Sequence, residues 1–421
     1  MYDFIERIAK EGYTVPESIE NVIAEKLALF YNVPLSEKYN LSNYLTDNRN
    51  RIAKGLRDMF CGCKVEYSGK ELLYALYYLP INMFKIWTPL VDIAHRKSAL
   101  SNNLIVLDIG CGPGTSTLGL LEFYRNLACE YPDNRYNITI DIIEQQMEFI
   151  NLFVEIYDEY KKSFPANLNV KLRNKYNKKF DGNFDFIDDK TYDLIYASNV
   201  FNVNENNDGK VFYDCCAGLK GKLKPESNMI FIEPGKKSIS NIFKKTRNEI
   251  EDKGLLDIYS PCCCLHECKH YKCVKFCVAK ITKIHSKLLN FLGHISSELA
   301  GKDKHSFDYV VFRNDNLKKY SPTRKKRTRI GDINWDRVGD DVNIIAIVMA
   351  CIEKTNGDIG MIICDGTTKD TVWLNIPKYL KVYHNINVEL IRGEQIDLKG
   401  ALICADNKLE LSRASELEVF Y

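Results

Sequence analysis

Three glycines alternate with other residues directly after a run of aliphatic side chains. The segment reads Asp-Ile-Gly-Cys-Gly-Pro-Gly over residues 108–114, and aliphatic residues 104–107 precede it. Glycine adopts backbone torsions that other residues avoid, and it lets a ligand approach the main chain closely. A helix predicted to begin at Thr115 would present free N–H groups at its first turn. The segment therefore predicts a ligand-binding loop between a buried strand and a helix.

This loop resembles the S-adenosylmethionine (SAM) loop of class I methyltransferases. It departs from the Gly-x-Gly-x-x-Gly pattern of dinucleotide-binding proteins, because its third glycine comes one residue earlier and an acidic residue precedes the loop. The resemblance implies a SAM-dependent methyltransferase. It also implies that the cofactor contacts these residues of the loop: Asp108, Gly110, Cys111, Gly112 and Gly114.

In class I methyltransferases the acid that ends the next strand holds both ribose hydroxyls of SAM, because a carboxylate can accept two hydrogen bonds. Glu144 ends the aliphatic run 138–144 and is our candidate, and Asp141 is the alternative if the strand stops earlier. The resemblance also places Asn199, which ends a further strand, near the cofactor. We find no Asn-Pro-Pro-Tyr motif there and no catalytic cysteine pair, so no catalytic residue is assigned. Methyl transfer from SAM depends mainly on positioning.

Six of the 15 cysteines lie within residues 262–277. Crowded thiolates repel one another unless a cation neutralises them, so this segment predicts a metal site. The chain starts without an apolar signal segment, and we therefore expect a cytoplasmic protein whose cysteines are reduced, not a disulfide scaffold. Four cysteines would suit an iron–sulfur cluster, whereas cysteines with His266 or His270 would suit zinc.

The order of motifs around the cysteines resembles the methyltransferase-like family associated with the small ribosomal subunit, best known from mitochondria. The resemblance extends over residues 67–351. Its main matches are Glu233-Pro-Gly, Arg247, Pro261-Cys262, Cys268, Phe276-Cys277 and Phe307-Asp-Tyr-Val-Val.

This second resemblance implies a 4Fe–4S cluster with four cysteine ligands, one of them far along the chain. The matching positions are Cys262, Cys268, Cys277 and, at the end of an apolar strand, Cys351. Cys364 on the next strand is the runner-up for the distant ligand. Two cysteines replace the family's Pro-His, so the choice among Cys262, Cys263 and Cys264 stays open, and Cys273 is a further alternative.

The charge balance excludes one class of partner contact. Lysine and arginine number 58 and aspartate and glutamate 56, which leaves a net charge of +2. A field over the whole protein that attracts polyanions is therefore excluded, and a nucleic-acid contact needs a local patch. The most basic stretch, residues 318–329, has seven basic residues in twelve and no acidic one. It predicts a solvated linker that is also suited to contact phosphates.

The last part of the chain, residues 335–421, alternates short β-rich runs with turn signals and predicts a small barrel. Its segments 364–374 and 393–419 resemble the OB-folds of archaeal single-strand-binding proteins. An OB barrel binds single strands in a charged groove and stacks bases on aromatic side chains. The stacking candidates are Trp373, Tyr379 and Tyr383, although an aromatic in a small barrel is more often part of its core.

The elements that must hold these sites define the fold class. Residues 101–250 alternate aliphatic runs with helical stretches and predict an α/β domain with a parallel sheet, the Rossmann-like fold of class I methyltransferases. The other expected parts are a helical N-terminal region (1–100), a cysteine-rich insert (251–317), a basic linker (318–334) and the barrel (335–421). The longest apolar run, 342–352, is too short to span a bilayer, so no membrane partner is expected.

Together these features predict a SAM-dependent methyltransferase with a 4Fe–4S cluster. Its expected partner is small-subunit ribosomal RNA or a pre-ribosome, contacted in part by an OB barrel that binds single-stranded nucleic acid. Composition favours an archaeal source. Two alternatives stay open: a non-catalytic SAM-binding factor for ribosome assembly, and a zinc-stabilised methyltransferase that acts on a protein or a small molecule.

Overall fold

The structure is a computed structural model, and it divides the chain into two compact units. Met1–Tyr259 and Val278–Leu317 form the first unit, and Ser260–Cys277 and Lys318–Tyr421 form the second. The described residues are 3–40, 44, 46–60, 70–94, 100–179, 182–187, 191–201, 209–261, 265, 278–295, 304–320, 326–368, 370–381 and 393–420.

The first unit is built on an eight-stranded sheet with the strand order β4-β3-β2-β5-β6-β10-β7, in which β8 also pairs with β10. Neighbours from β4 to β6 run parallel, whereas β10 runs antiparallel to β6 and β8. The strands are β2 (Asn103–Ile109), β3 (Tyr136–Glu144), β4 (Leu168–Asn177), β5 (Tyr192–Ser198), β6 (Leu223–Pro234), β7 (Asp257–Ser260), β8 (Val278–Thr282) and β10 (Lys304–Arg313). The strand order reverses between β2 and β5, which is where doubly wound sheets bind ligands.

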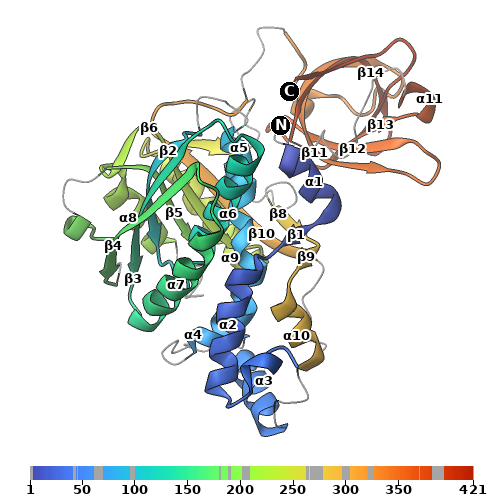
Figure 1. Cartoon of the computed structure of the whole chain (residues 1–421). Coiled ribbons are helices and arrows are strands. Elements are labelled where there is room, and N and C mark those ends of the chain that lie inside the picture. Colours follow the sequence, from blue (N-terminus) through green and yellow to red (C-terminus); the bar gives the residue numbers. More distant parts are fainter. Residues whose placement is uncertain are drawn as a thin grey trace. The chain divides into compact units, whose positions relative to one another are not determined.

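Helices cover both faces of this sheet (Figure 1). α6 (Thr115–Glu130) and α7 (Met147–Tyr160) share one core with alternate residues of the strands. α8 (Lys210–Lys220) and α9 (Lys237–Asp252) cover the other face, where Phe212 of α8 packs on Phe231 of β6 and Phe243 of α9. Because the central strands are buried on both faces, they appear in the sequence as continuous aliphatic runs.

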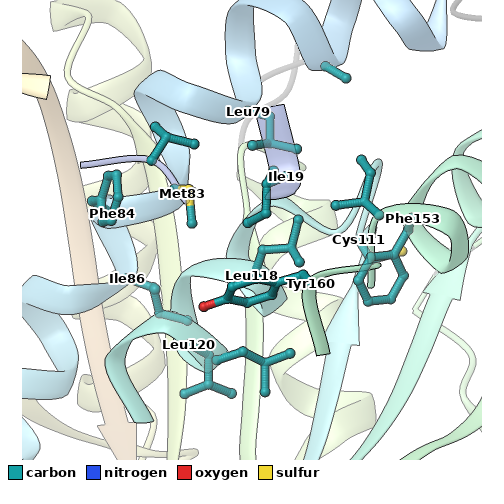
Figure 2. Close-up of a cluster of buried hydrophobic side chains, with 14 of the residues drawn as sticks. Ile19, Leu79, Met83, Phe84, Ile86, Cys111, Leu118, Leu120, Phe153 and Tyr160 are labelled. Atoms are coloured by element: carbon teal, nitrogen blue, oxygen red, sulfur yellow. The ribbon is translucent and has the colours of Figure 1, made fainter. Parts of the chain in front are cut away.

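The N-terminal helices belong to the same core. They are α1 (Asp3–Glu11), α2 (Glu17–Phe30), α3 (Thr46–Phe60), α4 (Glu71–Asn82) and α5 (Trp87–Ala94), with the 3₁₀ turns η1 (Leu35–Glu37) and η3 (Met83–Ile86). Figure 2 shows Ile19, Leu79 and Met83 among residues of α6 and α7. A Cβ on Gly119 of α6 would lie 1.8 Å from the Met83 carbonyl oxygen, so glycine is required for this approach. The N-terminal helices therefore share one hydrophobic core with the sheet and do not form a separate domain.

Residues expected in the cysteine-rich insert also complete the first unit. β10 inserts between β6 and β7, and its residues Phe307, Tyr309 and Val311 enter the shared core. β9 (Ile284–His285) pairs in parallel with β1 (Tyr13–Thr14), and α10 (Lys287–Ile295) follows. The expected insert boundary at 251–317 therefore differs from the structure. A strand's alternation pattern does not show which sheet the strand will join.

The second unit contains a closed barrel in which β11-β12-β13-β15-β14 form a ring and β16 pairs with β14. Its elements are β11 (Asp341–Glu353), β12 (Ile359–Cys364), β13 (Val372–Ile376), α11 (Lys378–Lys381), β14 (Gln395–Cys404), β15 (Lys408–Glu410) and β16 (Glu416–Phe420), after the turn η6 (Ile330–Asp332). A small barrel was expected here, and the described strands form one.

The barrel begins earlier than residue 335. Ile330 and Ile333, expected in the basic linker 318–334, are buried in the barrel core. Arg327 binds Asp397 of β14 through two hydrogen bonds of 2.6 and 2.8 Å, so this arginine is already neutralised. A run of like charges hides such a pairing because its partner lies 70 residues away. Among the residues described, no helix is both long and apolar enough to cross a membrane.

Candidate cofactor site

The three glycines of the loop face three different surroundings, and all have positive φ angles (63°, 54° and 78°). A Cβ on Gly110 would lie 2.8 Å from Cγ2 of Val200, and one on Gly114 would lie 1.9 Å from Cδ2 of Phe153. For Gly112 the nearest atom is Cε1 of Tyr74, at 3.9 Å. The outer glycines therefore permit close packing, whereas the middle glycine borders open space.

Glu144 at the end of β3 binds the loop directly. Its Oε2 accepts a hydrogen bond from the Gly112 N–H and its Oε1 one from the Gln146 N–H, both at 2.9 Å. Burial raises the pKa of Glu144 above its ordinary value, and these backbone donors act against the shift. The carboxylate thus fixes the middle glycine and remains at the edge of the open space.

Asp141, the alternative acid, lies within the sheet. Its carboxylate accepts two hydrogen bonds from Arg173 (2.9 and 2.7 Å), one from the Tyr192 hydroxyl (2.8 Å) and two from Asn174 (3.0 and 2.9 Å). Burial acts to raise the pKa of Asp141, but the hydrogen bonds from Arg173 and Tyr192 outweigh it and lower the pKa. Asp141 therefore stabilises the strands beneath the site.

A cavity of about 130 Å³ opens over the loop at the strand switch point. Residues from five segments line it: Tyr74, Gly110, Gly112, Glu144, Gln145, Gln146, Phe149, Ser198, Asn199 and Val200. Tyr74 of α4 and Phe149 of α7 meet edge to face, with ring centroids 5.4 Å apart, and form an aromatic wall. The predicted residues Gly110, Gly112, Glu144 and Asn199 are thus brought together.

Asp108 and Cys111 belong to the loop segment, but both are buried and neither lines this cavity. The Asp108 carboxylate accepts a 2.6 Å hydrogen bond from the Thr117 hydroxyl, which lies 2.8 Å from the Tyr196 hydroxyl. Burial raises the pKa of Asp108 to about 7. The Cys111 thiol is buried and donates to the Gly112 carbonyl at 3.3 Å. Asp108 therefore supports the start of α6, and direct contact with a cofactor remains a prediction for both residues.

Two of the three stacking candidates lie among the described residues of the barrel, Trp373 on β13 and Tyr379 on α11. Trp373 is half-buried, pairs in register with Ile362 and Lys408, and lies 3.5 Å from the position of a Cβ on Gly360. Exposed Tyr379 lies 5.7 Å from the Arg413 guanidinium. Strands two and three of an OB barrel are the strands that bind oligonucleotides. Tyr383, the third stacking candidate, lies outside the described residues.

Comparison with known proteins gives structural matches only: no protein-family model and no curated protein sequence matches the chain. A methyltransferase from Pyrococcus furiosus is 14% identical over 54% of this chain and 83% of its own, with a TM-score of 0.29. The N-methyltransferase NodS from Bradyrhizobium japonicum, solved with S-adenosyl-L-homocysteine, is 12% identical over 55% and 88%, with a TM-score of 0.30. An OB domain from Methanosarcina mazei is 21% identical over 22% and 82%, with a TM-score of 0.18. Similarity at this level assigns no activity, so the ligand must be inferred from the site's own geometry.

Among the predicted metal ligands, only the barrel candidates Cys351 and Cys364 lie in the described part of the chain. Cys262, Cys268 and Cys277 lie outside the described residues, as do Cys263, Cys264 and Cys273. Within the described part of the chain, no group of three or more histidine, cysteine, aspartate or glutamate side chains could hold a metal ion.

The two candidate barrel cysteines have different surroundings. Cys351 of β11 is half-buried against the barrel core, and burial raises its pKa to about 11. Cys364 of β12 is buried in a separate cluster with Ile347 and Leu265, and Leu265 directly follows Cys264 in the sequence. Of these two cysteines, Cys364 shares a cluster with Leu265 and Cys351 does not.

Two contributors to the cavity wall were not predicted. Tyr74 and Phe149 come from helices whose apolar faces give no sign of a ligand, because aromatic residues at helical spacing are typical of a core. The contacts of Tyr74 and Phe149 with the cavity depend on the tertiary fold.

Proposed function

We propose that the protein is a SAM-dependent methyltransferase. The supporting observation is that Gly112 borders the cavity while Glu144 holds its N–H, at the sheet's switch point. A side chain on Gly112 would enter this space, which is why glycine suits the position. The residues present fit SAM: a carboxylate beside exposed main chain and an aromatic wall.

SAM supplies an electrophilic methyl group, and the chain's residues provide position. Glu144 offers carboxylate oxygens at the cavity edge, and Tyr74 and Phe149 exclude water from one side. Asn199, with φ of 58°, directs the chain after β5 along the cavity. Alignment of this kind accounts for a large part of the rate enhancement in transfer reactions.

The test is methyl transfer from labelled SAM to small-subunit ribosomal RNA, together with SAM binding by calorimetry. Label in the RNA would support an enzyme. Tight SAM binding without transfer to RNA or to any supplied protein would favour the non-catalytic assembly factor. Absence of binding would refute the cofactor assignment itself.

We further propose a metal site, preferably a 4Fe–4S cluster, held by Cys262, Cys268 and Cys277 with a cysteine of the barrel. The contacts of Leu265 support Cys364 as the barrel ligand. The sequence alone favours Cys351, which packs against the barrel core and shares no cluster with Leu265.

Cys364→Ser is expected to remove most of the bound iron, whereas Cys351→Ser is expected to retain it, because a thiolate ligand has no equivalent in a serine hydroxyl. Iron and sulfide would be measured on anaerobically purified protein. Loss of iron only in the Cys351 variant would reverse the assignment. A colourless protein with zinc would establish the zinc-stabilised alternative.

The barrel is proposed to bind single-stranded RNA across Trp373. Trp373→Ala is expected to weaken this binding by about 1–3 kcal/mol, the value of one base stacked on an aromatic side chain. Trp335→Phe is the matched control, since Trp335 packs against the barrel core. Fluorescence anisotropy with a labelled oligonucleotide measures the affinity of both variants. An unchanged affinity for Trp373→Ala would show that Trp373 contributes to packing and not to RNA binding.

A further inference from the structure

The carboxylate of Glu233, at the end of β6, binds the backbone that follows β5. Its Oε1 accepts hydrogen bonds from the N–H groups of Val200 and Phe201, each at 3.0 Å. The side chain is 1% exposed. Val200 lines the cavity and faces Gly110, so Glu233 reaches the cavity through the backbone that it holds.

The preceding residue shows why this backbone needs holding. Asn199 has a φ of 58°, a left-handed conformation that persists in non-glycine residues when the surroundings impose it. Its N–H donates to the Ile232 carbonyl at 2.8 Å. Two neighbouring residues of β6 therefore bind three consecutive N–H groups, those of residues 199–201.

A buried lysine lies near the same carboxylate. Lys85 of η3 is 6% exposed, and its ammonium lies 5.6 Å from the ring centroid of Phe307. Phe307 pairs with Pro234, the residue after Glu233. Burial lowers the pKa of Lys85 to about 8, and the negative charge of Glu233 acts against this shift. A buried charge is costly without an opposite charge, and the negative charge of Glu233 offsets part of this cost for Lys85.

We infer that Glu233 is a positioning residue of the cofactor site, that it holds residues 199–201 as one wall of the cavity, and that Lys85 acts through it as counter-charge. The Glu-Pro-Gly motif then has a physical explanation. A Cβ on Gly235 would lie 3.0 Å from the Ser306 carbonyl carbon, so glycine lets the chain pass β10 closely just after the glutamate. This inference rests on the proposed function, because SAM affinity is used to measure whether residues 199–201 are held in place.

The fold supplies a matched control pair. Asp308 of β10 lies directly opposite Glu233 in register and is fully buried. Its Oδ1 lies 2.9 Å from Nζ of Lys244 on α9, a helix that contributes no residue to the cavity lining. Both carboxylates are equally buried, so changing either should lower stability, but only a change at Glu233 should also weaken SAM binding.

The experiment compares Glu233→Gln, Glu233→Ala, Lys85→Met and the Lys85→Met/Glu233→Gln double variant with Asp308→Asn, by SAM calorimetry and thermal unfolding. Glu233→Ala is expected to weaken SAM binding about tenfold and Glu233→Gln less, since glutamine keeps an acceptor oxygen. Asp308→Asn is expected to lower the unfolding temperature with SAM affinity changed less than twofold. The double variant should lose less than the sum of the singles, because coupled residues are not additive.

Equal loss of SAM affinity in the Asp308 and Glu233 variants would overturn the positioning role, and additive losses would overturn the role of Lys85. If the wild-type protein binds no SAM, the proposed function fails, but the inference is still tested by amide hydrogen exchange. Exchange at residues 199–201 should then be faster in Glu233→Ala than in Asp308→Asn. Unchanged exchange would overturn the inference.

Discussion

Gly112→Arg is expected to abolish SAM binding while leaving the protein folded. An arginine side chain would extend from the Gly112 backbone into the cavity of about 130 Å³, where only Tyr74 lies within 4 Å of the Cβ position. The left-handed φ of 54° adds strain of about 1–3 kcal/mol, which the first unit should tolerate. Calorimetry measures the binding, and circular dichroism and thermal unfolding measure the fold.

Gly114→Ala is the informative control, because it changes the same loop for a different reason. Its Cβ would lie 1.9 Å from the Phe153 ring, so the variant should lose stability even without a ligand. If Gly112→Arg unfolds as readily as Gly114→Ala, or if it still binds SAM, the assignment of Gly112 to the open side of the loop is wrong.

Asp141→Ala should lower stability strongly, by about 3 kcal/mol, because it removes a fully buried carboxylate and leaves Tyr192 and Asn174 without their acceptor, while Arg173, its partly exposed partner, loses its ion pair. Denaturant unfolding measures this change. Asp158→Ala is the control: this exposed carboxylate pairs with Lys161 on the surface of α7 and should change stability by less than about 0.5 kcal/mol. A similar small effect for Asp141→Ala would show that Arg173 gains nothing from the pair.

The Asp141 carboxylate should also make the stability of the protein depend on pH. Its pKa is lowered in the folded protein, so the deprotonated form contributes stability above its ordinary pKa near 3.8. That contribution is lost as the pH falls through the lower, folded value. Wild-type stability should therefore decline in acid more steeply than that of Asp141→Ala, and parallel pH profiles would contradict the assignment.

The glycine loop could be predicted from sequence because its information is local. Strand, acid, glycines and helix start are contiguous, and the structure brings Gly110, Gly112, Glu144 and Asn199 to one cavity. Asp108 is adjacent to the same glycines, yet its carboxylate turns to Thr117. The spacing of residues in the sequence does not show whether the Asp108 side chain points toward the cavity or toward α6.

The rest of the site and fold depended on distant partners. Arg327 within a basic run binds Asp397, and Glu233 binds the backbone of Val200. Neither contact produces a periodic pattern of residues in the sequence. The boundaries differed for the same reason: the segment Phe307-Asp-Tyr-Val-Val matches a family motif, but only its pairing with β6 shows that β10 belongs to the first sheet.

The pairing of β1 with β9 has a consequence for synthesis on the ribosome. Tyr13 pairs with Ile284, and the buried Glu20 carboxylate accepts hydrogen bonds from the Ser286 hydroxyl and the Leu288 N–H. At a synthesis rate of roughly 5–20 residues per second, about 15–50 s pass between the synthesis of the N-terminal helices and that of these partners. A nascent chain ending at residue 250 would hold the glycine loop, α6 and α7, and would still lack β9 and α10. Glu20 therefore gains these hydrogen-bond donors only after a residue 266 positions further along the chain has been made.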